Sequence, residues 1–307
     1  MRRSVSIWHQ AYRLTRPFTI GHGTRTVADC VHVTITQGSH RGEAACIPYA
    51  RYGESIDSVM DQIESIRSAL ERGLSIAELQ MALPAGAARN AIDCALWRID
   101  SYQQKIPIWQ LLDLPDPTLF DRSRMCDTVS VNDPVYMANQ AKNMSAHIIK
   151  VKCMGDGLDR DRIDAIRQVC PSNELLIDPN ESWSLTELED YFDHCEERGV
   201  SIIEQPVPAI DDSVLETIRT SIDVCADESC HTSTDVPVLL GRYTMVNVKL
   251  DKTGGLTEAA RLIHCARHAG LKVMVGCMVG PELCIQPALE LLGSVDIADL
   301  DGPQFLR

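Results

Sequence analysis

From residue 119 to residue 307 the sequence alternates between short apolar runs and amphipathic stretches such as LDRDRIDAIRQVC. Strict alternation of strand and helix patterns predicts a parallel sheet, and eight units in fewer than 200 residues predict a closed (β/α) barrel. Neither G-x-G-x-x-G nor G-x-x-x-x-G-K-[ST], which would favour an open nucleotide-binding sheet, is present. The eight runs are MCDTVSV, HIIKVK, ELLIDPN, VSIIEQP, IDVCADES, TMVNVKL, LKVMVGC and VDIADLDG.

Residues 1–118 follow a different pattern, in which strand-like segments come before helical ones. The run DCVHVTIT alternates like a strand, and the following QGSHRGE carries turn residues. Three helical stretches follow, namely ESIDSVMDQIESIRSALERG, SIAELQMAL and GAARNAIDCALWRIDSYQQ. We therefore expect an α+β unit, residues 1–118, ahead of the barrel unit, residues 119–307.

Polar residues end most of the eight apolar runs. The carboxyl ends of the strands of a (β/α) barrel meet at one mouth, where active sites are built. Successive polar ends lie about one β/α unit apart, so we expect their side chains to converge. These residues are Lys150, Lys152, Asp178, Glu204, Asp227, Lys249, Asp299 and Asp301.

The run HIIKVK places two lysines on one face of a strand. Side chains alternate with a period of two, so Lys150 and Lys152 point one way and Ile149 and Val151 the other. An exposed edge strand, where lysine discourages aggregation, would give the same pattern. The acidic residues that end the following runs favour a barrel mouth instead.

Three acidic residues, Asp178, Glu204 and Asp227, end successive runs and suggest a metal site. Convergent carboxylates repel each other unless a cation neutralises them. Ligation by oxygen alone suits a hard ion, Mg²⁺ before Mn²⁺ or Ca²⁺. Each residue taken alone could instead cap a helix, since Asp often stands at a strand–helix junction.

The lysines suggest proton transfer. Lysine has an ordinary pKa of ~10.4, which desolvation and a neighbouring cation would lower. The pair Lys150 and Lys152 is expected across the barrel from Lys249, so a substrate between them has a base on each face. Such a pair can remove a proton α to a carboxylate, giving an enediolate whose charge a divalent ion stabilises, and return it from the other side.

Several motifs together carry a family resemblance. KVK, DPNESW, EQP, ADES, VKLDKTGG and DLDGP resemble the dipeptide epimerases of the muconate-lactonizing subgroup of the enolase superfamily. PYARYGES and LPAGAARNAIDCALW are similar to the L-Ala-D/L-Glu epimerases, so the resemblance covers nearly the whole chain. It implies an α/β fold: a modified (β/α) barrel with an N-terminal α+β capping domain. Lysine bases with Mg²⁺ are the chemistry of this superfamily.

The resemblance also implies roles for individual residues. Lys152 and Lys249 match the two acid/base residues, and Lys150 matches a helper on the substrate carboxylate. The acidic pair Asp299 and Asp301 matches the D-x-D that holds the free α-amino group of a dipeptide, although a solvated acidic turn is the simpler alternative. The implied Mg²⁺ ligands, with Mn²⁺ as a possible substitute, are Asp178, Glu204 and Asp227; the implied pocket residues are Thr128, Cys277 and Met278.

The sequence departs from the family pattern in the loop FTIGHGTRT, which supplies the candidate substrate-binding residues His22 and Arg25. His22 stands where the Ala-Glu enzymes usually carry arginine. A neutral imidazole cannot replace a bidentate arginine on a carboxylate, so we expect a weaker preference for acidic second residues. Gly280–Glu282 replace small polar residues, and relatives continue past the position of Arg307 with a strand that returns to the cap.

Two kinds of alternative function stay open at this point. The same scaffold serves N-acylamino-acid racemases, o-succinylbenzoate synthases and cycloisomerases, none of which needs Asp299 and Asp301. A catalytically silent metal-binding barrel is the other alternative, and intact Lys152 and Lys249 argue against it.

Composition limits the partners. The net charge of −14 argues against a nucleic-acid surface and suits a small-molecule substrate, here a dipeptide. No apolar run approaches membrane-spanning length, and no apolar segment follows the first arginines as in a secretory signal. The twelve cysteines include no C-x-x-C pair, and we expect them, Cys94 and Cys265 among them, to be reduced core residues of a cytoplasmic protein. A homo-oligomer is possible.

Overall fold

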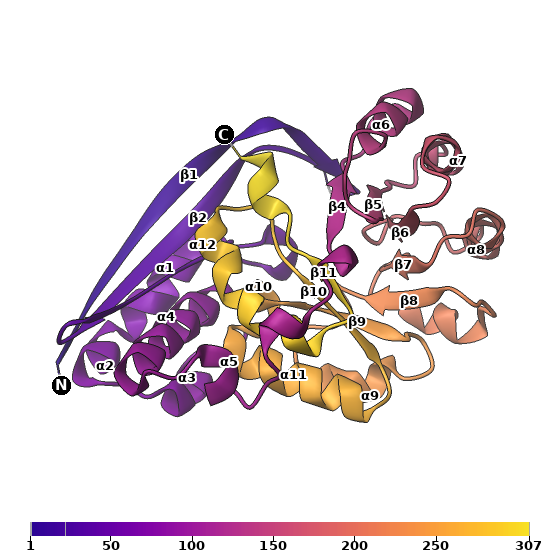
Figure 1. The fold of residues 1–307 in the computed structure, drawn as a ribbon. Coiled ribbons are helices and arrows are strands. Elements are labelled where there is room, and N and C mark those ends of the chain that lie inside the picture. Colours follow the sequence, from indigo (N-terminus) through magenta and orange to yellow (C-terminus); the bar gives the residue numbers. More distant parts are fainter. Residues whose placement is uncertain (1, 22, 307) are drawn as a thin grey trace.

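The computed structural model describes residues 2–21 and 23–306. A three-stranded antiparallel sheet with its helices is followed by an eight-stranded parallel barrel (Figure 1). The long strands of the first sheet reach over to the barrel side of the molecule (Figure 1). The predicted fold class, a barrel with an N-terminal α+β cap, is confirmed.

The antiparallel sheet has the order β1-β2-β3. Val31, Val33 and Ile35 are fully buried on one face of the middle strand, while Cys30 packs on the other face with Cys284 of the barrel unit. The run DCVHVTIT is a strand, as predicted, but QGSHRGE is only partly a turn, because the third strand begins at His40. The strands are β1 (Arg3–Ile20), β2 (Gly23–Gln37) and β3 (His40–Cys46).

The helices of the first unit begin at recognisable caps. Ser55 and Ser58 form a capping box at the start of the first helix, and Ser75 and Glu78 form another. The first predicted helical stretch is interrupted at Ile66, which gives two helices. The elements are the 3-10 turn η1 (Ala50–Tyr52) and the helices α1 (Ile56–Ser65), α2 (Arg67–Arg72), α3 (Ile76–Ala82), α4 (Ala87–Gln104) and α5 (Ile108–Leu111).

All eight predicted barrel strands are present, in the order β11-β10-β9-β8-β7-β6-β5-β4. A parallel bridge between Met125 and Ala298 joins the first and last strands, so the sheet closes. The strands are β4 (Cys126–Val129), β5 (Ile148–Lys152), β6 (Glu174–Asp178), β7 (Ile202–Glu204), β8 (Asp223–Ala226), β9 (Met245–Lys249), β10 (Lys272–Gly276) and β11 (Ile297–Asp299).

The barrel interior is packed in layers. One buried apolar residue from each strand forms the lower layer, which comprises Cys126, Ile148, Leu176, Ile202, Cys225, Met245, Met274 and Ile297. Because side chains alternate, the residue two positions later on each strand points inward again, toward the mouth. These positions hold Thr128, Lys150, Asp178, Glu204, Asp227, Asn247, Gly276 and Asp299.

Helices cover the outside of the barrel (Figure 1). They are α6 (Pro134–Ala141), α7 (Asp159–Val169), α8 (Leu188–Glu197), α9 (Val236–Leu239), α10 (Leu250–Thr253) and α11 (Leu256–His268), whereas α12 (Glu282–Ile285) packs against β3 of the capping sheet. Shorter 3-10 segments are η2 (Pro117–Leu119), η3 (Arg122–Arg124), η4 (Asp212–Thr217), η5 (Ser233–Asp235), η6 (Gln286–Ser294) and η7 (Gly302–Phe305). Across the described ranges, no helix is long and apolar enough to cross a membrane.

Helix α4 holds the capping unit to the barrel. Arg89 donates hydrogen bonds to the backbone oxygens of Thr253 (2.6 Å) and Gly254 (3.2 Å). At the other end of the chain, Leu306 forms a bridge with Leu14 of β1, so the last described residues return to the capping sheet. The twelve cysteines are free, and ten are buried; the expectation of a core position is wrong for Cys265, which is exposed on α11.

Candidate active site

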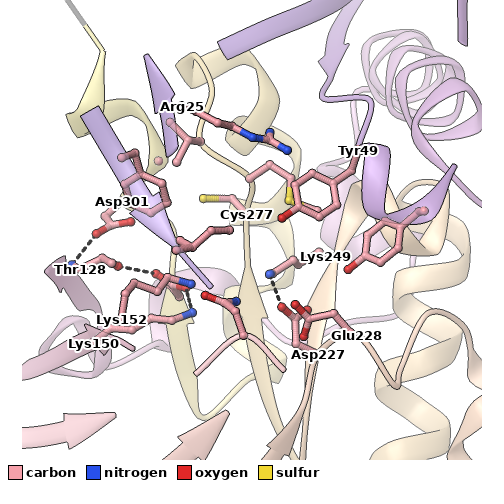
Figure 2. Close-up of a pocket in the computed structure, with 18 residues that line it drawn as sticks. Arg25, Tyr49, Thr128, Lys150, Lys152, Asp227, Glu228, Lys249, Cys277 and Asp301 are labelled. Carbon is pink, nitrogen blue, oxygen red and sulfur yellow. Dashed lines mark hydrogen bonds and ion pairs between the residues drawn. The ribbon is translucent and has the colours of Figure 1, made fainter. Parts of the chain in front are cut away.

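A pocket opens where the barrel mouth meets the capping unit (Figure 2). Asp178 and Glu204 do not line it but contact its lysines from below. His22 lies outside the described residues. The other predicted site residues all line the pocket: Arg25, Thr128, Lys150, Lys152, Asp227, Lys249, Cys277, Met278, Asp299 and Asp301.

The parallel register brings these side chains together. Lys152 pairs in register with Asp178, and Thr128 with Lys150 on the other side. Gly276 leaves room for an inward neighbour, because a Cβ there would lie 2.5 Å from the side-chain oxygen of Asn247. Asn247 uses that space to donate to Glu204 Oε1 at 2.8 Å.

Lys150 lies at the centre of a buried charge cluster. Its Nζ lies 2.6 Å from Asp299, 2.7 Å from Glu204 and 3.0 Å from Asp178, and the residue is 1% exposed. Burial lowers the pKa of Lys150, but the three carboxylates outweigh it and hold the pKa well above its ordinary value. Lys150 is therefore a cation that joins its own strand, β5, to β6, β7 and β11.

Lys152 and Lys249 approach the pocket from opposite sides (Figure 2). Their strands, β5 and β9, are four apart in an eight-stranded barrel, which places them across from each other. Each ammonium lies 2.5 Å from one carboxylate, Lys152 from Asp178 and Lys249 from Asp227. Both lysines are 7% exposed. The geometry thus places one lysine ammonium on each side of the pocket.

Among the protein groups that surround it, Lys249 has a raised pKa, and the expected lowering of a lysine pKa by a neighbouring metal cation stays a prediction. Burial lowers its pKa, but the charges of Asp227 and Glu204 outweigh burial and leave the pKa well above its ordinary value. Proximity to a carboxylate at 2.5 Å is the physical reason.

The three predicted metal ligands are buried and adjacent. Asp178, Glu204 and Asp227 are 0–1% exposed at the ends of neighbouring strands. Within residues 2–21 and 23–306 no three acidic, His or Cys side chains already surround a common point, because lysine ammonium groups stand among the carboxylates. Burial and the repulsion of Asp178 raise the pKa of Glu204 to about 7. An all-oxygen, buried and repelling donor set fits a hard divalent cation.

Asp299 and Asp301 form an acidic pair that is separate from the three predicted metal ligands. Asp301 lies at the opposite edge of the pocket from Asp227 (Figure 2). Asp301 accepts a hydrogen bond from the backbone N–H of Thr128 at 2.6 Å, and Asp299 pairs with Lys150. Burial and the charge of Asp299 raise the pKa of Asp301 to about 7. A solvated turn does not describe this pair, since both residues are less than 9% exposed. Two buried carboxylates with a single lysine suit an added ammonium group.

Sequence reasoning missed pocket residues from the capping unit. Tyr49 and Tyr52, at either side of Arg51, line the pocket, and the Arg25 guanidinium lies 4.6 Å from the centre of the Tyr49 ring. Their motif, PYARYGES, was available only as a family likeness, because nothing in its pattern predicts contact with the barrel. Gly280, one of the departures from the family, lies where a Cβ would come 2.8 Å from Ile47 of the cap.

Sequence reasoning also missed Lys252. Its ammonium donates to the backbone oxygen of Asp227 (2.5 Å), to Asp227 Oδ1 (2.7 Å) and to the backbone oxygen of Asn247 (2.9 Å). Asp227 therefore has a lysine on each carboxylate oxygen, Lys252 on one and Lys249 on the other. The signal was its position three residues after Lys249, one turn into the helix that follows the strand.

Comparison with known families defines the class. Residues 2–113 match the family "Mandelate racemase / muconate lactonizing enzyme, N-terminal domain", and residues 136–299 match the family "Enolase C-terminal domain-like". The chain belongs to this family of the enolase superfamily, as its motifs suggested.

Individual relatives narrow the comparison. The L-Ala-D/L-Glu epimerase of Escherichia coli K12 is 44% identical, over 99% of this chain and 94% of the relative. An N-acetyl-D-glutamate racemase of a Pseudoalteromonas species is 40% identical, over 88% of this chain and 85% of the relative. Epimerases and racemases are isomerases.

Solved structures give the same picture. An enolase family member of Agrobacterium tumefaciens with homology to dipeptide epimerases, with bound sodium and L-Ala-L-Glu, has a TM-score of 0.94 at 38% identity, over 99% of this chain and 92% of that chain. The dipeptide epimerase of Cytophaga hutchinsonii, complexed with Mg and D-Ala-L-Val, has a TM-score of 0.92 at 27% identity, over 100% of this chain and 89% of that chain.

Proposed function

We propose that this protein is a dipeptide epimerase, which inverts the α-carbon next to the free carboxylate of a dipeptide. The observation that carries the proposal is the placement of Lys152 and Lys249 on opposite sides of a pocket that also contains the Asp299–Asp301 pair. Lysines on two sides suit inversion at carbon, and a buried acidic pair suits the amino group of a dipeptide.

In this proposal one lysine takes the α-proton and the other returns one from the opposite face. Lys152 and Lys249 exchange these roles according to the isomer that is bound, so the reaction runs in both directions. The enediolate that exists between the two steps carries its charge on the former carboxylate. Lys150, a buried cation on the same strand as Lys152, is the helper that holds this group.

The proposed metal ligands are Asp178, Glu204 and Asp227. Bound Mg²⁺ would supply positive charge to the substrate carboxylate as the α-proton leaves. Support comes from the all-oxygen donor set and from a related structure complexed with Mg. Substitution by Mn²⁺, a homo-oligomeric state and a cytoplasmic location stay predictions.

The second residue of the dipeptide is proposed to face Arg25. This guanidinium lines the pocket, which favours an acidic side chain. The expectation drawn from His22 points the other way, toward neutral dipeptides. L-Ala-L-Glu set against L-Ala-L-Leu separates the two, and the Arg25 position leads us to propose the acidic substrate.

An N-acylamino-acid racemase is the second candidate, supported by the 40% identical N-acetyl-D-glutamate racemase. An acylated nitrogen carries no positive charge, so it would leave the two buried carboxylates of Asp299 and Asp301 with Lys150 as their one ion-pair partner among the described residues. The dipeptide proposal uses that pair and is preferred for this reason.

A substrate panel in D₂O tests the proposal. Dipeptides and N-acetyl amino acids are incubated with protein and Mg²⁺, and each turnover that exchanges the α-hydrogen raises the substrate mass. We expect label and inversion in dipeptides, and little in N-acetyl amino acids. Label confined to the N-acetyl compounds would establish the second candidate, and no label anywhere would indicate a silent barrel.

A further inference from the structure

The capping unit is held to the barrel in two places of different character. Helix α4 is bound by buried contacts, such as the hydrogen bond from Asn90 to Asp251 at 2.7 Å. The turn η1, which carries Tyr49 and Tyr52 into the pocket, lies at the mouth instead. There a cross-unit ion pair joins it to the loop that follows β6.

The ion pair joins Arg51 of η1 to Glu181. Arg51 Nε lies 2.8 Å from Glu181 Oε2, and Arg51 Nη2 lies 2.8 Å from Oε1. Two parallel charge-assisted hydrogen bonds fix both distance and orientation. Glu181 Oε1 also accepts from the backbone N–H of Ala209 at 2.9 Å. One carboxylate therefore joins the capping unit to the loops after β6 and β7.

The two partners differ in exposure. The Glu181 side chain is 4% exposed, whereas the Arg51 side chain is 42% exposed. The hydrogen bond to Glu181 raises the pKa of Arg51 above its ordinary value. The acceptor is thus buried in the barrel loop, whereas the donor lies half-exposed in a turn of the capping unit.

The conformation of the loop after β6 orients the Glu181 carboxylate. Asn180 and Glu181 have φ values of 47° and 66°, in the left-handed region that costs non-glycine residues energy. The strained turn is held by two hydrogen bonds. The backbone N–H of Asn180 donates to Asp178 Oδ1 (3.0 Å), and the backbone N–H of Glu181 donates to the backbone oxygen of Gln205 (2.9 Å). Such strain persists where the surroundings enforce it, as they do beside a pocket that Asn180 itself lines.

The residues on either side of Arg51 form a wall of the pocket. The Tyr49 ring lies under Arg25, and the Tyr52 ring meets His231 edge-on, 4.5 Å between ring centres. Figure 2 shows Tyr49 facing the pocket on the same side as Lys249. A change in the position of η1 would therefore move this wall, while the lysines stay on their barrel strands.

We propose that Arg51 is a positioning residue, which through its bidentate pair with Glu181 holds η1 in place and so sets the capping wall of the substrate pocket. The inference rests on the proposed function for its kinetic consequence only. Substrate contacts on the wall are weakened when the pair is lost, whereas Lys152 and Lys249 are untouched. Loss of the pair should therefore raise KM and leave kcat nearly unchanged.

The test compares two arginine variants of the capping unit. Arg51→Gln removes the cross-unit pair. Arg67→Gln is the matched control, because Arg67 makes an equally bidentate pair with Glu64 (2.6 and 2.6 Å) between α1 and α2, away from the pocket. A general structural role predicts similar results for both variants. A positioning role predicts a kinetic change for Arg51→Gln alone.

We expect Arg51→Gln to raise the KM for the best dipeptide roughly tenfold or more, the loss expected for a hydrogen bond between charged groups, with kcat within about threefold of wild type. Arg67→Gln should leave both constants within about twofold. If Arg51→Gln does not fold, Arg51→Lys, which keeps the charge but not the fork, should raise KM in the same direction. An unchanged KM, or an equal rise in both variants, overturns the proposal.

A second readout needs no activity. The amides of Tyr52, Gly53 and Glu54 donate within the turn, to Tyr49 O (2.9 Å), Ala50 O (3.0 Å) and Tyr49 O (3.3 Å). Hydrogen exchange at these amides should quicken in Arg51→Gln and stay at the wild-type rate in Arg67→Gln. Wild-type exchange in Arg51→Gln overturns the inference even if the dipeptide proposal holds. Faster exchange in a protein that labels no dipeptide leaves the inference standing while the proposed function fails.

Discussion

At the scale of single residues, each buried lysine of the site lies against at least one carboxylate. Lys152 faces Asp178, Lys249 faces Asp227, and Lys150 is shared among three carboxylates. Removing one partner of a buried pair leaves an uncompensated charge, which costs about 3–5 kcal/mol. Variants that change proton transfer must therefore be checked for folding before their kinetics are compared.

The two-lysine mechanism predicts an asymmetric result for single variants. Lys249→Ala should lose epimerisation yet keep some exchange of the α-hydrogen for the isomer that faces Lys152, and Lys152→Ala should give the mirror result. Each variant lacks the lysine that returns the proton on the opposite face. NMR of each isomer in D₂O measures both processes. Interconversion by either variant at nearly the wild-type rate would end the two-base proposal.

The acidic pair predicts a loss confined to free dipeptides. Asp301→Asn should weaken the binding of the transition state of a free dipeptide by about 2–5 kcal/mol, as expected when a desolvated charge loses its partner. This loss is measured as a fall in kcat/KM. Asp301→Asn should not lower the free energy of unfolding, because the substitution relieves the repulsion between Asp301 and Asp299. The matched control is the same dipeptide acetylated at nitrogen, whose slow turnover should not change. An equal loss on both substrates would contradict the ammonium role.

The proposed metal site predicts a measurable stabilisation. Mg²⁺ that binds only the folded protein adds about 2.7 kcal/mol at a hundredfold excess over Kd, so thermal unfolding should shift upward. Glu204→Gln keeps the shape of the side chain but removes its charge, and should reduce that shift. Glu197→Gln, an exposed position on α8, is the control and should keep it. A full Mg²⁺ shift in Glu204→Gln would argue against Glu204 as a ligand.

At the scale of elements, β3 and α4 approach closely at one glycine. A Cβ at Gly42 would lie 2.0 Å from the backbone oxygen of Ala95 and 3.0 Å from Ile99 Cγ1. The helix backbone cannot move aside without separating from the sheet. Gly42→Ala should therefore lower the free energy of unfolding by about 1–3 kcal/mol or more. Chemical denaturation measures the loss, and a change below about 0.5 kcal/mol would contradict it.

The barrel strands could be predicted because each is a short, largely apolar run, and most of their inward ends could be predicted because most of these runs have a polar end. Strand β1 could not, since half of its residues, such as His9 and Gln10, are exposed and the strand gives no regular apolar period. Tyr49 and Lys252 reach the site only through the packing of separate segments. Local pattern cannot give this packing. Nor could it give the carboxylate at 2.5 Å that raises the pKa of Lys249. The division at residues 118 and 119 stays a prediction.

At the scale of the whole molecule, the seam between the two units contains buried carboxylates. Asp251 accepts from Asn90 (2.7 Å) and from the backbone N–H of Ile47 (3.2 Å), and Asp93 accepts from the Thr257 hydroxyl at 2.6 Å. Burial raises the pKa of Asp251 to about 7 and that of Asp93 to about 6. These hydrogen bonds favour the charged form, but burial outweighs them. Folding, which buries these carboxylates at the seam, is therefore linked to proton uptake.

The linkage predicts how stability depends on pH. An unfolded aspartate has a pKa of ~3.9, so between about pH 4 and 7 the folded protein binds the extra proton at Asp251 and its stabilisation is lost as pH rises. Asp251→Asn cannot ionise. As pH rises across this range, its free energy of unfolding should therefore increase relative to that of wild type, by on the order of a few kcal/mol at about 1.4 kcal/mol per pKa unit. Urea denaturation of both proteins from pH 4.5 to 7.5 measures the difference. Asp61→Asn, an exposed change on α1, should follow the wild-type curve. If the curve of Asp251→Asn runs parallel to wild type, Asp251 is not the group that couples the seam to pH.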